Sequence, residues 1–191
     1  MKIKTNKKIE TSSEVKKEKK RVNPTWEAIQ RDYPILSYAA PEMFDWRMRY
    51  LIDTNIFIYW ILDFDSLSTD VKSILEDYEN TFYLSSESVK ELIVGFNNGK
   101  LVSHYWNNAS EMVKDITNRY FVHVLPVGEE QMETYARLQL NLAEDHRDPS
   151  DHVIISHAIN NHLPLISSDS KFLFYINQGL ELIYNKKKGN W

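Results

Sequence analysis

The sequence predicts an α/β fold with three layers, in which helices cover both faces of a central, mostly parallel sheet. Short apolar runs of strand length alternate with amphipathic helical segments, and this alternation is typical of parallel sheets. Hydrophobic residues make up 42% of the 191 residues, which is enough to fill the core of one such domain. The chain has no cysteine, which excludes disulfides and thiolate chemistry and fits a cytoplasmic location. No apolar run is long enough to span a bilayer, so no membrane partner is expected.

The first predicted strand is the short buried pattern of residues 49–52, which ends at Asp53. Ser85 or Ser86 follows the second predicted strand. Either is a good N-cap for the helix beyond, because a hydroxyl oxygen accepts a backbone N–H at the start of a helix. In this half of the chain the periodicity predicts strands over 49–52, 81–84 and 121–125, and helices over 55–62, 67–78, 86–99 and 106–117.

The second half of the chain continues the alternation. Pro149 precedes a helical pattern over 150–160, and a strand pattern over 163–167 leads to a short helix from Ser170. A further helix is predicted over 129–143 and a last strand over 180–184. Strands that are separated by helices pair in parallel, because the crossover returns each strand in the same direction.

Charge divides the chain into three parts. The net charge is -4, but residues 1–22 carry nine Lys or Arg and three Glu, whereas the rest carries fourteen basic and twenty-four acidic residues. We expect a basic and then aromatic N-terminal extension over 1–46, partly disordered, a folded domain over 47–185, and a short basic tail over 186–191. So acidic a domain is unsuited to general nucleic-acid binding, because phosphate contacts depend on cations. Metal ions that neutralise a cluster of its acids would change that.

Two aspartates directly follow predicted strands. Asp53 follows residues 49–52, and Asp169 follows the run 164–168. In an open α/β sheet, ligands bind beyond the carboxyl ends of the strands. Each acid taken singly is more often a turn or N-cap residue, but two at one edge favour a site.

Two further acids lie on predicted helices. Asp151 precedes apolar residues at offsets of three, four, seven and eight, which define one helical face, so its carboxylate is expected to point toward the sheet. Burying it requires a cation or hydrogen bonds, and the alternative is a capping role in the first helical turn. Glu91 lies off the apolar stripe of its helix, and Glu87 is a rival; a solvent-facing position is the default for both.

Four acids at one sheet edge would repel one another without cations, and Mg²⁺ or Mn²⁺ prefer oxygen ligands. Such ions activate water for phosphodiester cleavage. A phosphatase with an aspartate nucleophile is disfavoured, because Asn55 stands where a second acid is usual, and no Gly-rich phosphate loop follows a strand. His152, His157 and His162 are spaced by five, which rotates them off a shared face. We expect them at the surface or as capping residues.

Four segments, in order, resemble the motifs of PIN domains, and of VapC-type toxins in particular. Residues 48–55 resemble the opening strand and its acid, and the segment around Glu91 resembles the second motif. Residues 146–158 resemble the third motif and 163–169 the fourth. The match runs from about Met48 to Tyr184. The four motifs together are specific for this family, whereas the first alone is not.

The resemblance implies a PIN-like α/β/α fold and an RNA endonuclease that depends on Mg²⁺ or Mn²⁺. It also implies a cognate antitoxin whose tail occupies the site and, often, a homodimer. By matching position, four acids inherit catalytic and metal-binding roles: Asp53, Glu91, Asp151 and Asp169. The resemblance thus selects Glu91 over Glu87. Four residues are expected in supporting roles, capping a helix or orienting the carboxylates: Asp148, Thr54, Asn55 and Ser168.

Two departures from the family pattern matter. Ser150 and His152 stand where relatives often carry an aromatic residue and an arginine, so different substrate contacts are expected. Such toxins also usually begin near the first strand, whereas 47 residues precede Met48 here. These are interpreted either as an over-extended start or as an antitoxin-like tail fused in cis. The competing function is a non-catalytic PIN-like module that binds protein or RNA, and the presence of all four acids ranks it second.

Overall fold

The computed structural model describes residues 48–186, which contain a five-stranded sheet with strand order β3-β2-β1-β4-β5. The strands are β1 (Arg49–Ile52), β2 (Thr81–Ser85), β3 (His123–Leu125), β4 (Leu165–Ser167) and β5 (Leu182–Tyr184). Each strand pairs with its neighbours in parallel. The predicted parallel α/β fold is therefore confirmed.

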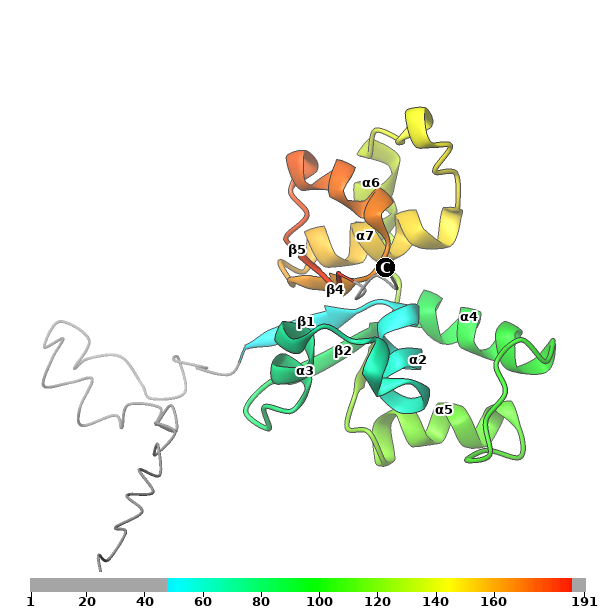
Figure 1. Cartoon of the computed structure of the whole chain (residues 1–191). Helices are drawn as coiled ribbons and strands as arrows, with labels where there is room; N and C mark the ends of the chain where they lie inside the picture. The colour runs from blue at the N-terminus through cyan, green and yellow to red at the C-terminus, as the bar shows by residue number, and fades with distance from the viewer. Residues whose placement is uncertain (1–47, 187–191) are drawn as a thin grey trace, which may run out of the picture. The chain divides into compact units, whose positions relative to one another are not determined.

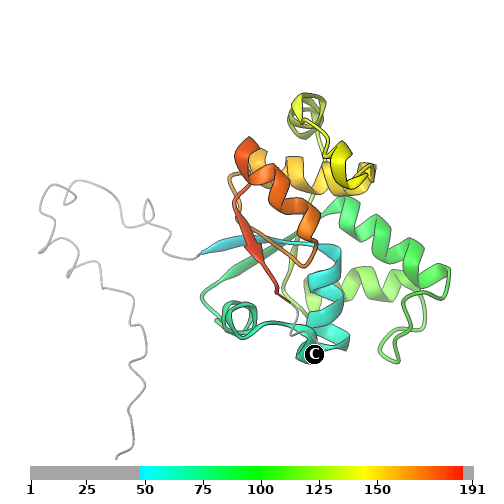
Figure 2. The same cartoon turned by 45° about the horizontal axis from the view of Figure 1, so that its top comes forward.

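Helices cover both faces of the sheet. On one face lie α6, α7 and η5, and on the other lie α2, α3 and α5 (Figure 1; Figure 2). The helical elements are α2 (Thr54–Leu62), η3 (Phe64–Ser66), α3 (Thr69–Leu75), α4 (Ser86–Asn97), α5 (Ala109–Asn118), α6 (Glu129–Arg137), η4 (Leu142–Glu144), α7 (Pro149–Asn160) and η5 (Ser170–Gln178). The η elements are 3₁₀ helices.

Alternating side chains of β1 contribute to two hydrophobic clusters. Tyr50 and Ile52 belong to the cluster that includes α2, α3, α4 and α5, whereas Leu51 belongs to the cluster of α7 and η5. Successive side chains of a strand point to opposite faces, so a strand covered on both sides reads as a continuous apolar run. Leu51 and Ile52 are fully buried, and each contributes roughly 1.5–3 kcal/mol of stability. This packing fixes the carboxyl end of β1, where Asp53 follows.

Several elements begin later than predicted. Ser68 and Asn108 are the N-caps of α3 and α5, so these helices start two and three residues late. Their side-chain oxygens accept backbone N–H groups there, which stabilises a helix start. Of the two candidates for capping α4, Ser85 is the N-cap. The last three strands each begin two residues later than predicted.

The helix predicted over 129–143 is wrong in its second half. α6 ends at Arg137, and its C-cap, Leu138, has an extended backbone. Beyond it, the backbone N–H of Gln139 donates to the Gln178 side chain at 2.8 Å, and that of Asn141 donates to the Tyr175 hydroxyl at 3.3 Å. Tertiary partners therefore replace the helical hydrogen bonds that periodicity alone predicted.

The predicted extension over 1–46 and most of the predicted tail over 186–191 lie outside the described residues, so these domain boundaries stay predictions. Within residues 48–186, no helix is both long and apolar enough to cross a membrane.

Candidate active site

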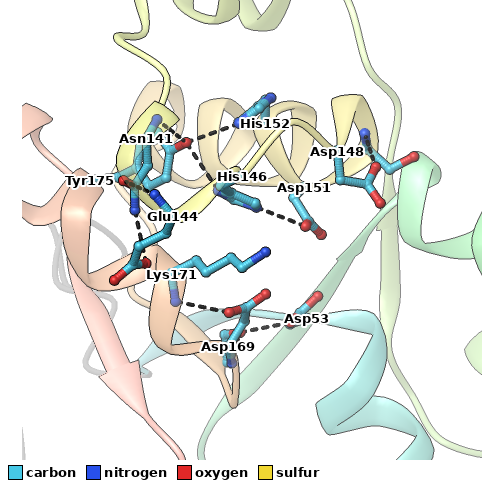
Figure 3. Close-up of polar contacts among 12 residues, drawn as sticks. Asp53, Asn141, Glu144, His146, Asp148, Asp151, His152, Asp169, Lys171 and Tyr175 are labelled. Atoms are coloured by element: carbon cyan, nitrogen blue, oxygen red, sulfur yellow. Dashed lines mark hydrogen bonds and ion pairs between the residues drawn. The ribbon is translucent and has the colours of Figure 1, made fainter.

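The order of the strands reverses between β1 and β4. The chain runs from β1 outward to β2 and β3, and it later places β4 and β5 on the other side of β1. The crevice at such a switch point, beyond the carboxyl ends of the strands, is where ligands bind in open α/β sheets. Asp53 follows β1, and Asp169 follows β4 and caps η5 by accepting the N–H of Lys171 at 2.8 Å. The structure thus brings the two strand-end acids to one place (Figure 3).

Asp53 is the most buried of the four predicted acids, with 3% of its surface exposed. Its Oδ1 accepts the N–H of Thr54 at 2.7 Å, and its Oδ2 accepts the Ser167 hydroxyl at 2.7 Å. Burial raises the pKa of Asp53 to about 7, and the charges of Asp151 and Glu91 act in the same direction, although both hydrogen bonds oppose them. A carboxyl with such a pKa needs a nearby cation to be fully ionised at neutral pH.

Glu91, on α4, contacts Thr54, the residue that follows Asp53. Its Oε2 accepts the Thr54 hydroxyl at 2.5 Å, and burial raises its pKa. Glu87, the rival acid on this helix, instead accepts the Ser150 hydroxyl at 2.6 Å and forms an ion pair with Lys90. These contacts favour Glu91 over Glu87 as the member of the cluster.

Asp151 lies in the first turn of α7, which begins at the same edge of the sheet. Its side chain is 23% exposed, and its Oδ2 lies 2.9 Å from His146 Nε2. Burial raises the pKa of Asp151, while the hydrogen bond to His146 opposes this. Asp148 is the N-cap of α7, and its Oδ1 accepts the N–H of Ser150 at 2.9 Å. Asp151 therefore contacts another side chain, that of His146, and Asp148 takes the capping position of α7.

Ser167, and not the predicted Ser168, links the two strand-end acids. Its hydroxyl donates to Asp53 Oδ2 and accepts the backbone N–H of Asp169 at 3.1 Å. Consecutive side chains at the end of a strand point to opposite faces, so only one of the two serines can face Asp53. Asn55, another predicted supporting residue, is exposed on α2.

Ligand atoms of these residues lie close enough to share a cation. One group contains His146, Asp151 and Asp169, and another contains Glu91, Asp148 and Asp151; within each group the ligand atoms lie within 4.8 Å of one another. Asp151 belongs to both groups. The helix that carries Asp151 thus connects the acid after β4 with the acid on α4.

The negative charge of this cluster has no lysine or arginine ion-pair partner among residues 48–186. The lysines and arginines that form ion pairs there do so with other acids; for example, Lys90 pairs with Glu87 and Arg119 pairs with Asp115. Lys171 extends between Asp151 and Asp169 (Figure 3), but it forms no ion pair with either within the described part of the chain. Carboxylate oxygens that form no ion pair with a lysine or arginine suit hard divalent cations. The residues present therefore fit Mg²⁺ or Mn²⁺.

Two histidines that were expected at the surface or as caps are buried. His152 and His157 are each 1% exposed, so the prediction is wrong for both, whereas His162 is exposed. A spacing of five does rotate these residues to different faces, but α7 packs against α6 and α4 as well as the sheet-facing core, so several of its faces are interior. Burial lowers the pKa of His152 and His157.

In the sequence, His146 is recognisable only as part of the third motif, yet in the structure it is 2% exposed and contacts Asp151. Its ring also contacts the hydroxyl of Tyr175, on η5. The only signal in the sequence was a histidine five residues before an acid that heads an apolar helical stripe. Periodicity could not show the contact, because His146 lies in a loop and Tyr175 is 29 residues away along the chain.

Comparison with known families gives one match that spans this site. The family model described as the PIN domain matches residues 50–175, a range that contains all four predicted acids. No curated protein matches the chain significantly.

Solved structures share the fold. VapBC2 from Rickettsia felis, bound to a DNA fragment from its promoter, is similar with a TM-score of 0.54 and 23% identity, over 73% of this chain and 100% of that chain. VapBC-1 from nontypeable Haemophilus influenzae has a TM-score of 0.54 and 24% identity, over 72% and 98%. DNA-bound VapBC from Salmonella typhimurium has a TM-score of 0.53 and 18% identity, over 73% and 99%.

Proposed function

Since this chain belongs to the PIN-domain family, we propose that it is a metal-dependent endoribonuclease and the toxin of a toxin–antitoxin pair. The proposed metal ligands are the four acids at the switch point: Asp53, Glu91, Asp151 and Asp169. One observation carries the proposal. Ligand atoms of Glu91, Asp151 and Asp169 belong to the two groups that could share a cation, and Asp53 lies near enough for the charges of Asp151 and Glu91 to raise its pKa. Within residues 48–186 no lysine or arginine forms an ion pair with any of the four acids. Such a cluster is costly unless a cation compensates its charge.

The proposed chemistry divides between the cation and the protein. When bound, a divalent cation supplies an activated water nucleophile and stabilises charge on the attacking and leaving oxygens of a phosphodiester. The chain's own residues hold the ligands in place: Ser167 and the backbone of Thr54 each bind one oxygen of Asp53, and the Thr54 hydroxyl binds Glu91. Water attacks the phosphorus, the bond between phosphorus and the 3′ oxygen breaks, and the departing 3′ oxygen takes up a proton. The products therefore carry a 5′-phosphate and a 3′-hydroxyl.

Cleavage of RNA by the purified chain tests this proposal. We expect Mg²⁺ or Mn²⁺ to support cleavage, and EDTA to stop it because removing the metal ion removes the activated water. Products that carry 5′-phosphate and 3′-hydroxyl ends would support attack by metal-activated water. Cleavage that continues in EDTA, or products with cyclic phosphate ends, would contradict it.

The two glutamates of α4 give a matched pair of variants. Replacing Glu91 by glutamine should lower the rate of RNA cleavage by about 10²-fold, because a metal ligand is lost. Replacing Glu87 by glutamine should change the rate by less than about twofold, since Glu87 contacts Lys90 and Ser150 and belongs to neither group of ligand atoms. Initial rates at saturating Mn²⁺ make the comparison. Equal losses in both variants would remove Glu91 from the proposed site.

We further propose that the partner of this chain is a cognate antitoxin, and that the toxin acts as a homodimer. The fold that this chain shares with the VapBC structures supports the antitoxin. The unbalanced carboxylates also favour a cationic partner segment, because opposite charges complement one another across an interface. Light scattering of the purified chain tests the dimer, and a mass of one chain would contradict it.

A further inference from the structure

We propose that His146 is a positioning residue, which holds the carboxylate of Asp151 toward the metal site and is itself held by Tyr175 and His152. This inference rests on the proposed function, because it concerns one of the proposed metal ligands. The residues form a connected chain of polar contacts that runs from the interior of the domain to the cluster of acids (Figure 3).

The contact with Asp151 is direct. His146 Nε2 lies 2.9 Å from Asp151 Oδ2, and the imidazole is almost fully buried while the carboxylate is partly open to solvent. A ring that donates to one carboxylate oxygen fixes the rotation of the carboxylate and leaves the other oxygen free to bind a cation. Partners of this kind orient metal ligands, and losing one typically weakens metal affinity about 10–100-fold.

The other ring nitrogen of His146, Nδ1, contacts the hydroxyl of Tyr175. His146 Nδ1 lies 3.1 Å from the Tyr175 hydroxyl, and His152 Nε2 lies 2.9 Å from the same oxygen. The backbone N–H of Asn141 donates to this hydroxyl as well, at 3.3 Å. Tyr175 and both histidines are buried. A network with these partners in a buried setting defines one orientation for the His146 ring.

The backbone also directs His146 inward. Asp145 has a left-handed backbone, with φ 51°, and the next residue's N–H, that of His146, donates to the Asn141 carbonyl at 3.0 Å. The ring then packs against His152 and Phe172, with centroid distances of 4.8 and 5.7 Å. The turn, the backbone hydrogen bond and the ring contacts therefore place the same nitrogen beside Asp151.

A direct role as a metal ligand is the alternative, because the ligand atoms of His146, Asp151 and Asp169 lie within 4.8 Å of one another. Both ring nitrogens of His146 already have partners, however, at 2.9 and 3.1 Å. Binding a cation through Nε2 would require breaking the contact with Asp151. The geometry therefore favours a positioning role over direct ligation.

Two substitutions at position 146 test the contacts of the two ring nitrogens separately. Asparagine at position 146 retains a polar group near Nδ1, facing Tyr175, but does not reach Asp151; glutamine reaches to about the position of Nε2. We expect His146→Asn to weaken Mn²⁺ binding by the full chain about 10-fold or more and His146→Gln by less than about threefold. Electron paramagnetic resonance of free Mn²⁺ measures the dissociation constants, and His104→Gln, at an exposed histidine, serves as the matched control.

Each outcome decides between alternatives. Thermal unfolding of the metal-free variants checks that each one folds, and affinity is compared among those that do. If His146→Asn binds Mn²⁺ as tightly as the wild type, or if a nitrogen coupling from a histidine ligand appears in the wild-type Mn²⁺ spectrum and is lost in His146→Gln, the positioning role is overturned. A wild type that binds no Mn²⁺ would instead overturn the proposed function and this inference with it.

Discussion

Replacing Asp53 by asparagine is expected to reduce RNA cleavage about 10³-fold or more while leaving the fold intact. Asp53 is the buried acid of the cluster, and its two oxygens are held by Thr54 and Ser167. Asparagine keeps the shape and an acceptor oxygen but removes the charge that would bind a cation. A bound metal contributes several kcal/mol to stabilising a phosphodiester transition state, and each 1.4 kcal/mol corresponds to a tenfold change in rate.

Single-turnover cleavage of a labelled RNA in Mn²⁺ measures this effect. Asp65→Asn is a suitable control, because Asp65 is an exposed acid whose only ion pair among residues 48–186 is with Lys72, and it should cleave at the wild-type rate. If Asp53→Asn retained more than about one tenth of the wild-type rate, Asp53 would not be a metal ligand of the reaction.

The same substitution should stabilise the metal-free protein at alkaline pH. The pKa of Asp53 is raised from 3.8 to about 7 in the folded state, so the folded chain binds a proton more tightly than the unfolded chain does. Stability contributed by this group is therefore lost as pH rises from about 4 through about 7. A difference of about 3 pKa units corresponds to a cost on the order of 4 kcal/mol at pH 8, and asparagine removes that cost.

Urea unfolding in the presence of EDTA tests this at two pH values. We expect Asp53→Asn to be more stable than the wild type at pH 8, and the gap to close as the pH falls below 3.8, where the carboxyl is protonated in both states. The lowered pKa values of His152 and His157 change stability in the opposite direction, but they cancel in a comparison of the two proteins. If the wild type were as stable as Asp53→Asn at pH 8, the ionised carboxylate of Asp53 would not destabilise the metal-free protein, which would contradict this account.

Adding Mg²⁺ at pH 8 should then raise the stability of the wild type and not that of Asp53→Asn. A ligand that binds only the folded state stabilises it in proportion to the logarithm of its concentration over its dissociation constant. The metal and the mutation therefore relieve the same repulsion by different means. Equal stabilisation of both proteins by Mg²⁺ would place the cation away from Asp53.

The strand-end acids could be predicted from the sequence because their position follows from local rules. A buried strand has a readable apolar pattern, and the residue after it lies at the carboxyl edge of a parallel sheet wherever the strand pairs. This is why Asp53 and Asp169 could be placed at a common edge before the strand order was known. Asp151 was placed by helical periodicity in the same way.

The remaining parts of the candidate site depend on contacts between segments that are distant in the sequence. Only the family resemblance selects Glu91 over Glu87 in the sequence. The contact that supports this choice is with the Thr54 hydroxyl, 37 residues away, and no helical pattern contains that information. The Ser167 hydroxyl could not be distinguished from that of Ser168, because a one-residue shift in a strand end reverses the faces of the sheet. His146 requires the loop after α6, whose course is set by tertiary hydrogen bonds.

Sequencing of RNA 5′ ends after brief induction of the chain in cells tests most directly whether these carboxylates cleave RNA. Wild type and Asp53→Asn are induced to equal protein levels, and 5′-phosphate ends are compared with those of uninduced cells. We expect new ends at a small number of RNA positions with the wild type and none of them with Asp53→Asn. The same new ends in both strains, or none in either, would contradict a ribonuclease built on these four acids.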